Sequence, residues 1–167
     1  MKKILLYGLT FFCLSICLSS CMPKDDLVYT GPSVIEFKNH LQGRVAASQP
    51  AGIVSNGALT RSVRVNTRGT DTIYVQLVGP QLSVASVLPF TVNPQSTAIE
   101  GVHYKFNAAS PKTVTIPANS SVGYLLVDMV PNSVVGTATY PLILDLVGTD
   151  QIKPSPNYKT FTLTLRN

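Results

Sequence analysis

The stretch Thr160-Phe161-Thr162-Leu163-Thr164-Leu165 decides the fold of this 167-residue chain. Threonine alternates here with a large apolar residue, and successive side chains of a β-strand point to opposite faces of a sheet. The phenylalanine and the two leucines therefore share one face, as expected for a strand that covers a core. Residues 140–146 repeat the pattern, with one face made of Tyr140, Leu142, Leu144 and Leu146. Both stretches predict half-buried β-strands.

Shorter segments with the same character precede these two strands. They are residues 33–37, 62–66, 72–78, 87–92, 113–116 and 123–130. Arg68-Gly69-Thr70-Asp71 is a turn signal, so we expect 62–66 and 72–78 to pair as a β-hairpin. Pro89 lacks an N–H donor, which favours a sheet edge for the strand 87–92. No segment of the sequence shows helical spacing over about ten residues.

This order of strands and turns indicates the fold class. The chain contains 11 Gly and 12 Pro, many of them between the apolar segments. Serial short strands of this kind predict an all-β, antiparallel, Ig-like β-sandwich. The cysteine pair and the tryptophan of antibody domains are absent, so the core must depend on aliphatic packing with Phe37, Tyr140 and Phe161. We expect one such domain over residues 33–167.

The N-terminus has the pattern of an export signal. Met1-Lys2-Lys3 is basic, an apolar run follows, and Leu18-Ser19-Ser20-Cys21 ends the run with small residues and a cysteine. This predicts a lipoprotein signal peptide over residues 1–20, cut before Cys21, which then carries the lipid. An uncleaved membrane anchor is the alternative, but the run of about 15 residues falls short of the roughly 20 that a spanning helix needs. Several acyl chains on Cys21 would hold the protein on a membrane.

Residues 21–32 are the expected lipidated cysteine and flexible tether, because they are polar and contain Pro and Gly. Within this segment, Lys24-Asp25-Asp26 resembles the lysine-then-acidic export signal of surface lipoproteins in Bacteroidota. The alternative is a charged linker with no targeting role. The resemblance implies a lipid-anchored protein of the outer membrane whose domain faces the cell exterior.

Two internal stretches resemble Calx-beta-like domains. Residues 97–106, Thr-Ala-Ile-Glu-Gly-Val-His-Tyr-Lys-Phe, are similar to an element in which an alanine, a glycine and an aspartate–tyrosine pair precede a strand. Residues 114–121 resemble the run that leads into the next long strand. Over residues 60–167 the chain is similar to uncharacterised Ig-like lipoprotein domains of Bacteroidota. This similarity implies a fold and carries no assigned activity.

The calcium sites of Calx-beta domains are not expected in this chain. Those sites use clustered carboxylates, and His103 stands where the aspartate would precede the tyrosine. Calcium takes about six to eight oxygen ligands, with carboxylates prominent. The acidic residues of the domain are spread singly, at Glu36, Asp71, Glu100, Asp128, Asp145 and Asp150. We therefore expect no metal site and no cofactor.

Residues suited to catalysis are also sparse. Cys13 and Cys17 lie in the predicted signal and Cys21 carries lipid, so neither thiol catalysis nor a disulfide is expected. His40 and His103 are the two histidines, and no Gly-x-Ser-x-Gly elbow occurs. Glycoside hydrolysis would need two acids brought together across a cleft, which the sequence leaves open. We expect a protein that is not an enzyme, with His103 in a hydrogen-bonded turn.

The charge pattern argues against nucleic acid as a partner. The chain has 13 basic and 8 acidic residues, a net charge of +5, and most of the basic residues are scattered. Arg61, Arg64 and Arg68 come closest together, but alternation places Arg61 on the same strand face as Val63. No continuous basic stripe is therefore expected.

The leading hypothesis is a non-catalytic cell-surface lipoprotein that acts as an interaction or structural module. Loops carry most recognition on such scaffolds, which favours residues 38–59 and 79–86. The alternative is a glycan-binding accessory lipoprotein of a polysaccharide uptake system. Sugar platforms expose aromatic rings, and alternation predicts that Tyr74 and Tyr124 face outward. The expected partners are a membrane, through the lipid, and a protein or a glycan.

Overall fold

A computed structural model describes residues 29–38, 59–108 and 111–167. The predicted signal peptide, Cys21 and the export motif at residues 24–26 lie outside the described residues. His40 lies outside them too, as does all but the two ends of the predicted loop 38–59.

The described chain is all-β apart from one helical turn, which confirms the all-β prediction. Its strands are β1 (Val34–Phe37), β2 (Thr60–Arg64), β3 (Thr70–Val78), β4 (Ser86–Val92), β5 (Tyr104–Phe106), β6 (Thr113–Ile116), β7 (Val122–Met129), β8 (Thr139–Leu146), β9 (Lys153–Pro154) and β10 (Thr160–Arg166). The helical turn α2 spans Val65–Arg68.

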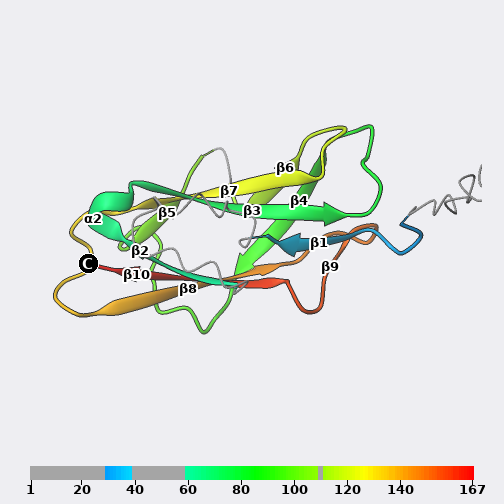
Figure 1. The fold of residues 1–167 in the computed structure, drawn as a ribbon. Coiled ribbons are helices and arrows are strands. Elements are labelled where there is room, and N and C mark those ends of the chain that lie inside the picture. Colours follow the sequence, from blue (N-terminus) through cyan, green and yellow to red (C-terminus); the bar gives the residue numbers. More distant parts are fainter. Residues whose placement is uncertain (1–28, 39–58, 109–110) are drawn as a thin grey trace, which may run out of the picture.

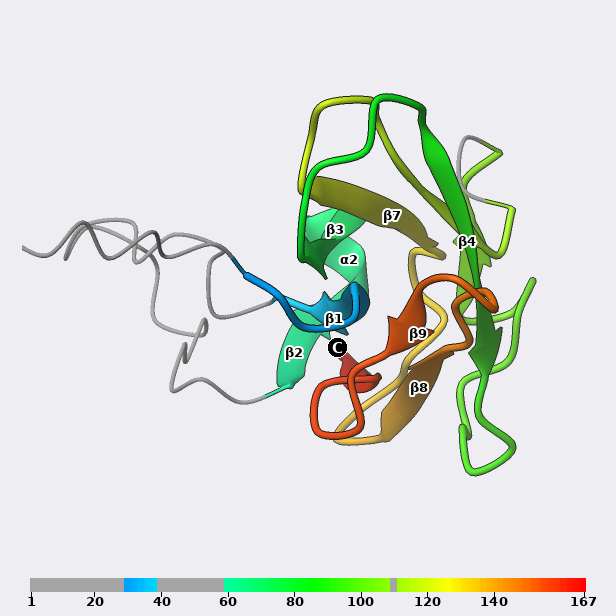
Figure 2. The same ribbon diagram turned by 90° about the vertical axis from the view of Figure 1, so that its right-hand side faces the viewer.

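The strands form one curled, mostly antiparallel sheet whose two halves face each other. The strand order is β2-β10-β8-β4-β6-β7-β3-β1-β9, and β5 pairs with β7 beside this path. Two pairings are parallel, β1 with β9 and β2 with β10. In Figure 1, β3 and β7 lie in one layer, β2, β8 and β10 lie in the other, and β4 crosses between them. Figure 2 shows the same curl from the end of the molecule.

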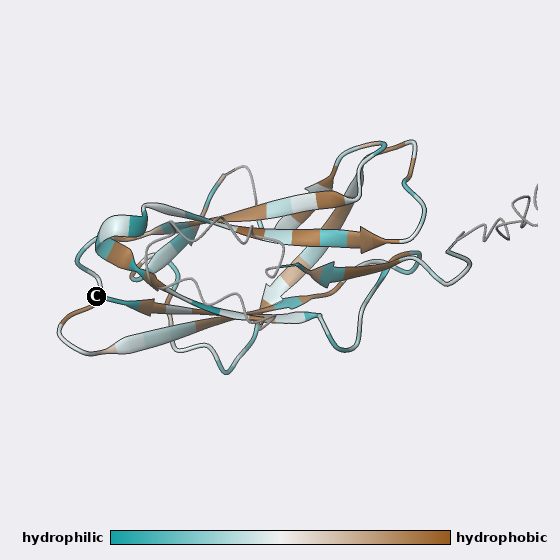
Figure 3. Cartoon of the chain, in the orientation of Figure 1, coloured by the Kyte–Doolittle hydropathy of each residue, from teal (hydrophilic) through white to brown (hydrophobic). Residues whose placement is uncertain are grey.

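Alternation along each strand decides which side chains enter the space between the layers. On β8 and β10 the buried residues are Leu142, Leu144, Leu146, Phe161, Leu163 and Leu165. The antiparallel register places Phe161 opposite Leu144 and Leu163 opposite Leu142. Figure 3 shows the resulting alternation of hydrophobic and hydrophilic residues along the strands. The buried face predicted for these two strands is therefore confirmed.

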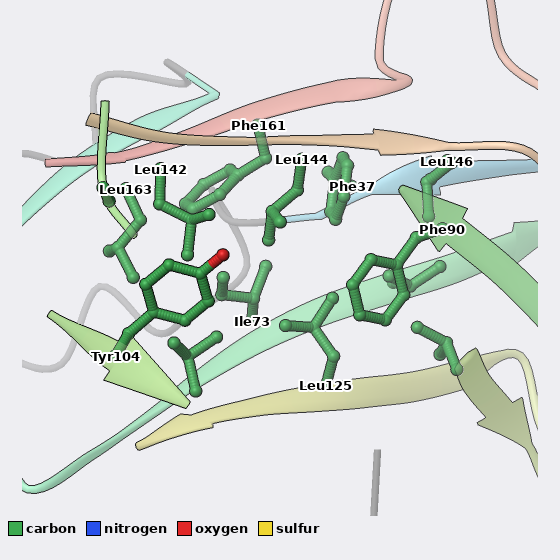
Figure 4. Close-up of a cluster of buried hydrophobic side chains, with 14 of the residues drawn as sticks. Phe37, Ile73, Phe90, Tyr104, Leu125, Leu142, Leu144, Leu146, Phe161 and Leu163 are labelled. Carbon is green, nitrogen blue, oxygen red and sulfur yellow. The ribbon is translucent and has the colours of Figure 1, made fainter. Parts of the chain in front are cut away.

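Side chains from both layers meet in a single core (Figure 4). The ring of Phe161 packs on that of Phe37, with 5.6 Å between their centroids. Ile73 of β3 and Leu125 of β7 reach the same core from the layer that faces Phe161. Tyr104 enters from β5, and burial, with a smaller contribution from Glu100, raises its pKa to about 12. Burial of each large apolar side chain contributes about 1.5–3 kcal/mol to folding.

The hairpin predicted between residues 62–66 and 72–78 is wrong. β2 pairs in parallel with β10, whereas β3 pairs antiparallel with β1 and β7. The helical turn α2 carries the chain from one layer to the other, and it begins at Val65, which buries its side chain. Gly69 ends the turn with a φ of 64°, a conformation that glycine adopts at little cost. Placing the two strands in facing layers buries the apolar face of each against one core.

The strand around Pro89 is not an edge strand, which corrects a second prediction. β4 pairs with β6 through residues 86–89 and with β8 through residues 90–92. The N–H of Phe90 donates to the carbonyl of Lys112 on the β6 side, at 3.1 Å. Because backbone groups alternate along a strand, the nitrogen of Pro89 faces the β8 side. There the carbonyl of Pro89 accepts from the N–H of Val147, the residue after β8, at 3.0 Å, and the pairing with β8 itself begins at the next residue. Pro89 therefore stands where the strand changes partners.

Shortening Leu144 tests the core register. Leu144→Ala should lower the free energy of unfolding by about 2–5 kcal/mol, because this side chain is fully buried and its loss leaves a cavity. Denaturant unfolding measures the change. The control Val135→Ala, at a side chain that is 79% exposed, should shift stability by less than about 0.5 kcal/mol. Equal effects of the two substitutions would show that the strand register is wrong.

Candidate functional site

The carboxylate of Asp71 lies inside the core between two arginines. Asp71 is on β3, and its Oδ2 accepts a hydrogen bond from Arg61 of β2, on the facing layer. Arg68 of α2 donates from Nε to Oδ1 at 2.7 Å. Arg61 also donates to the carbonyl of Thr72 at 2.9 Å. Burial lowers the pKa of Arg61, and the negative charge of Asp71 opposes that shift. Each charge therefore stabilises the other inside the core.

Two further aspartates are each held by neutral donors. Asp128 accepts from the hydroxyl of Thr70 at 2.6 Å and from the amide of Asn107 at 2.9 Å.

Asp145 has the same kind of environment. It accepts from the amide of Asn93 at 2.7 Å and from the hydroxyl of Thr160 at 2.6 Å. Each carboxylate therefore ties neighbouring segments together. Among the described residues, no three His, Cys, Asp or Glu side chains gather as a metal site would require.

His103 lies buried in the turn before β5, as the sequence predicts. Its Nδ1 accepts a hydrogen bond from the backbone N–H of Ile99 at 2.9 Å. Its ring stacks on Tyr140 of β8, with 4.0 Å between the centroids. The carbonyl of His103 accepts from Val130 at 3.1 Å. These contacts join the turn to both layers.

The outer face of the sheet presents a row of side chains that crosses four strands and ends at the residue after β1, Lys38. Lys38 is half-buried and the other four are exposed. Strand pairing places Val87 opposite Thr115, Thr115 opposite Tyr124, and Tyr124 opposite Tyr74. The N–H of Lys38 donates to the carbonyl of Tyr74 at 2.9 Å and extends the row beyond β3. We call these five residues the tyrosine row.

The two tyrosine rings are the largest exposed groups in this row. Tyr74 is 36% exposed and Tyr124 is 54% exposed, which confirms that both face outward. The rings meet edge to face, with 6.4 Å between centroids and an interplanar angle of 70°. This arrangement is favourable for aromatic pairs and holds each ring against the other. Each ring therefore keeps a defined orientation while part of it contacts solvent.

Gly123 explains how β6 and β7 come together under the row. A Cβ at this position would lie 2.7 Å from the carbonyl oxygen of Thr115 and 2.8 Å from a methyl carbon of Val114. Such distances are too short for any side chain, so glycine permits the close approach of β6 to β7. The approach brings Thr115 next to Tyr124.

Neutral side chains flank the two rings along β3 and β7, and Lys38 lies beside Tyr74 at the end of the row. Gln76 pairs with Val122, and Thr72 pairs with Leu126, on either side of the Tyr74–Tyr124 pair along β3 and β7. The other charged side chains stand further out on this face. Glu36 pairs with Gln76 from β1, and Lys105 pairs with Asp128 from β5. The rings therefore have mostly neutral neighbours, with Lys38 beside Tyr74 and the other charges further out.

The loop predicted to carry contacts after β3 is tied to the turn before β7. The N–H of Asn119 donates to the carbonyl of Leu82 at 2.7 Å, and the amide of Gln81 donates to Ser121 at 3.3 Å. Val84 projects from this loop and is 67% exposed.

In the described part of the chain, no helix is both long and apolar enough to cross a membrane.

No protein-family model and no curated protein matches the chain. Among solved structures, the chain is similar to a chain of the CsuC–CsuE chaperone–tip adhesion subunit pre-assembly complex from the archaic chaperone-usher Csu pili of Acinetobacter baumannii. The two share 11% sequence identity with a TM-score of 0.38, and the match covers 66% of this chain and 54% of that chain. The chain thus matches about half the length of that protein, which it distantly resembles.

Sequence reasoning missed the buried Arg61–Asp71 pair. A signal was present, because alternation already placed Arg61 on the same face as the apolar Val63. An arginine on the apolar face of a strand requires a buried partner. The partner itself could not be named from the sequence, because it lies on a strand in the other layer.

Removing the Asp71 carboxylate tests the buried pair. Asp71→Asn should lower the free energy of unfolding by about 3–5 kcal/mol, because Arg61 then keeps its charge in the core without a counter-charge. Denaturant unfolding measures the loss. The control Asp150→Asn alters an exposed carboxylate and should change stability by less than about 0.5 kcal/mol.

A double variant separates charge from shape at the same place. Replacing both charges by apolar groups, in Arg61→Met/Asp71→Leu, should leave a protein more stable than Asp71→Asn. A double variant less stable than the single one would mean that the geometry of the pair, and not the unpaired charge, carries the effect.

Proposed function

We propose that this protein is a non-catalytic, lipid-anchored lipoprotein of the cell surface, built on an Ig-like β-sandwich and acting as an interaction or structural module. The observation that carries the proposal is the contrast between polar side chains that bond within the fold and tyrosine rings that are exposed. Asp71, Asp128, Asp145 and His103 are engaged in contacts that join strands, while Tyr74 and Tyr124 face solvent.

Several features support binding rather than a reaction. Acid–base catalysis needs a titratable group within hydrogen-bonding reach of a substrate. His103 lies beneath Tyr140 and is 5% exposed, and Asp71 is fully buried between its arginines. Glu100 is exposed and pairs with Lys112 at 3.1 Å. The Ig-like assignment rests on the two facing layers of mostly antiparallel strands around one aliphatic core.

The proposed anchor constrains the position of the domain. Cys21 stands eight residues before Tyr29, where the described chain begins. At about 3.5 Å per extended residue, this tether spans at most about 28 Å. In Figure 1 the chain enters β1 at the end of the molecule away from α2 and the C-terminus. Under this proposal, α2 and the C-terminus lie on the side away from the membrane.

The alternative function is a glycan-binding accessory lipoprotein of a polysaccharide uptake system. The tyrosine row is the observation that favours it, because aromatic rings with one exposed face suit sugar rings. A protein that delivered glycans to an uptake system would need a face of this kind open at the cell surface.

Protease treatment of intact cells tests the proposed address. The wild-type domain should be removed, because lipidation at Cys21 and the motif 24–26 would place it outside. Asp25→Ala/Asp26→Ala should leave the protein membrane-bound and protected inside the cell. As a control for anchoring, Cys21→Ser should release the protein from the membrane fraction. A wild-type protein that resists protease while staying membrane-bound would mean that the domain faces the periplasm.

Thermal melts with and without calcium test the proposed lack of a metal. The two melting temperatures should coincide, because Asp128 and Asp145 are held singly by neutral donors. A ligand at a hundredfold excess over its Kd would stabilise the native state by about 2.7 kcal/mol. A rise in melting temperature with calcium that disappears in Asp128→Ala would contradict the proposal.

A further inference from the structure

We propose that the tyrosine row is a binding site for a neutral polysaccharide chain that lies across the strands of the outer face. The inference rests on the proposed function as a surface binding module, and it names the ligand class and the residues. It depends on the chemistry of the face, on its charge, on its size and on the direction of the row.

The chemistry of the row matches that of a sugar ring. A pyranose has apolar C–H faces and a rim of hydroxyl groups. Tyr74 and Tyr124 supply exposed aromatic surface, and each tyrosine also carries a hydroxyl for hydrogen bonding. Thr115 and Gln76 add a hydroxyl and an amide beside the rings. Tyrosine has few rotatable bonds, so its contact surface loses little entropy on binding.

The charge distribution favours a neutral ligand over an ionic one. Five side chains next to the two rings are uncharged: Thr115, Thr72, Gln76, Val122 and Leu126. Lys38, beside Tyr74 at the end of the row, adds a single positive charge. A basic centre would be needed to attract a polyanion.

Charges of both signs stand around the neutral side chains, one of them at the Lys38 end of the row. Glu36 and Asp128 are acidic and Lys38 and Lys105 are basic. Because the two signs balance, these charges have no net attraction for an anionic polymer. Hydroxyl-bearing chains without charge fit the whole face best.

The size of the face favours a thin ligand over a second protein. The exposed apolar groups around the row come from four side chains, Tyr74, Tyr124, Val87 and Val122. A stable protein–protein interface buries about 800 Å² on each partner, from about 20–30 residues. Four half-exposed side chains fall far below that area. A polysaccharide can bind through a few stacked rings and their neighbours.

The direction of the row predicts how the chain would lie. The five residues follow the strand order β4-β6-β7-β3, ending at the residue after β1. Neighbouring strands stand about 4.8 Å apart, so the four steps from Val87 to Lys38 span roughly 19 Å. A single sugar would cover one ring only. Affinity should therefore rise with chain length up to several sugar units.

The test measures binding of the full-length chain, purified in detergent micelles, to immobilised dextran, amylopectin, galactomannan and arabinoxylan, with polygalacturonate as the acidic comparator. At least one neutral polysaccharide should bind, and more tightly than polygalacturonate. Tyr74→Ala and Tyr124→Ala should each weaken that binding by about tenfold or more. Tyr124→Leu keeps apolar bulk without the ring and should show the same loss.

Tyr158→Ala is the matched control, because Tyr158 is 43% exposed and lies outside the row. It should leave the Kd within about twofold of the wild-type value. Melting curves of all variants confirm folding, since both tyrosine substitutions are at exposed side chains.

Three outcomes would overturn the glycan site. The first is that no neutral polysaccharide binds. The second is that binding survives both alanine substitutions. The third is a dimer, seen by sedimentation, that Tyr124→Ala dissociates, which would assign the face to a second copy of the chain. Protease accessibility on intact cells is scored separately, so a displayed protein without glycan binding refutes this site and leaves the proposed surface module standing.

Discussion

Arg61 of β2 and Asp71 of β3 meet inside the core, where water cannot solvate either charge. Taking two ions out of water costs several kcal/mol each, and only close pairing with further hydrogen bonds offsets that cost. Arg68 and the carbonyl of Thr72 provide those further bonds. Because the two strands belong to facing layers, a shift of either strand would leave a buried charge unpaired. The pair therefore favours one alignment of the two layers over its neighbours.

Much of the fold could be predicted from period-two alternation alone. The apolar faces of β8 and β10, and the outward direction of Tyr74 and Tyr124, follow from local spacing and are confirmed. The partners of each strand could not be predicted in the same way. The turn at Gly69 is compatible with a hairpin, and the pairing of β2 with β10 and of β3 with β1 and β7 prevents one. Pro89 likewise lacks an N–H donor, but whether this places its strand at a sheet edge depends on which strands lie on either side.

The candidate site, too, could be predicted from the sequence only in part. Local spacing predicts that each tyrosine is exposed, but it does not predict that the two rings touch. That contact requires β3 to pair with β7 in one register, and Thr115 joins the row only because Gly123 admits β6. Residues 50 positions apart thus form one surface through long-range pairing. The proposed export motif, in contrast, depends on local sequence alone, and its residues lie outside the described ones.

The buried ion pair and the exposed tyrosine face are two consequences of one strand register. Along β3, Asp71 and Ile73 point inward while Thr72 and Tyr74 point outward. A one-residue shift would bury the Tyr74 hydroxyl and expose the apolar side chains. It would also carry Asp71 away from Arg61, at the cost of an unpaired buried charge. The interior charge therefore helps to hold the outer face in the register that sets Tyr74 against Tyr124.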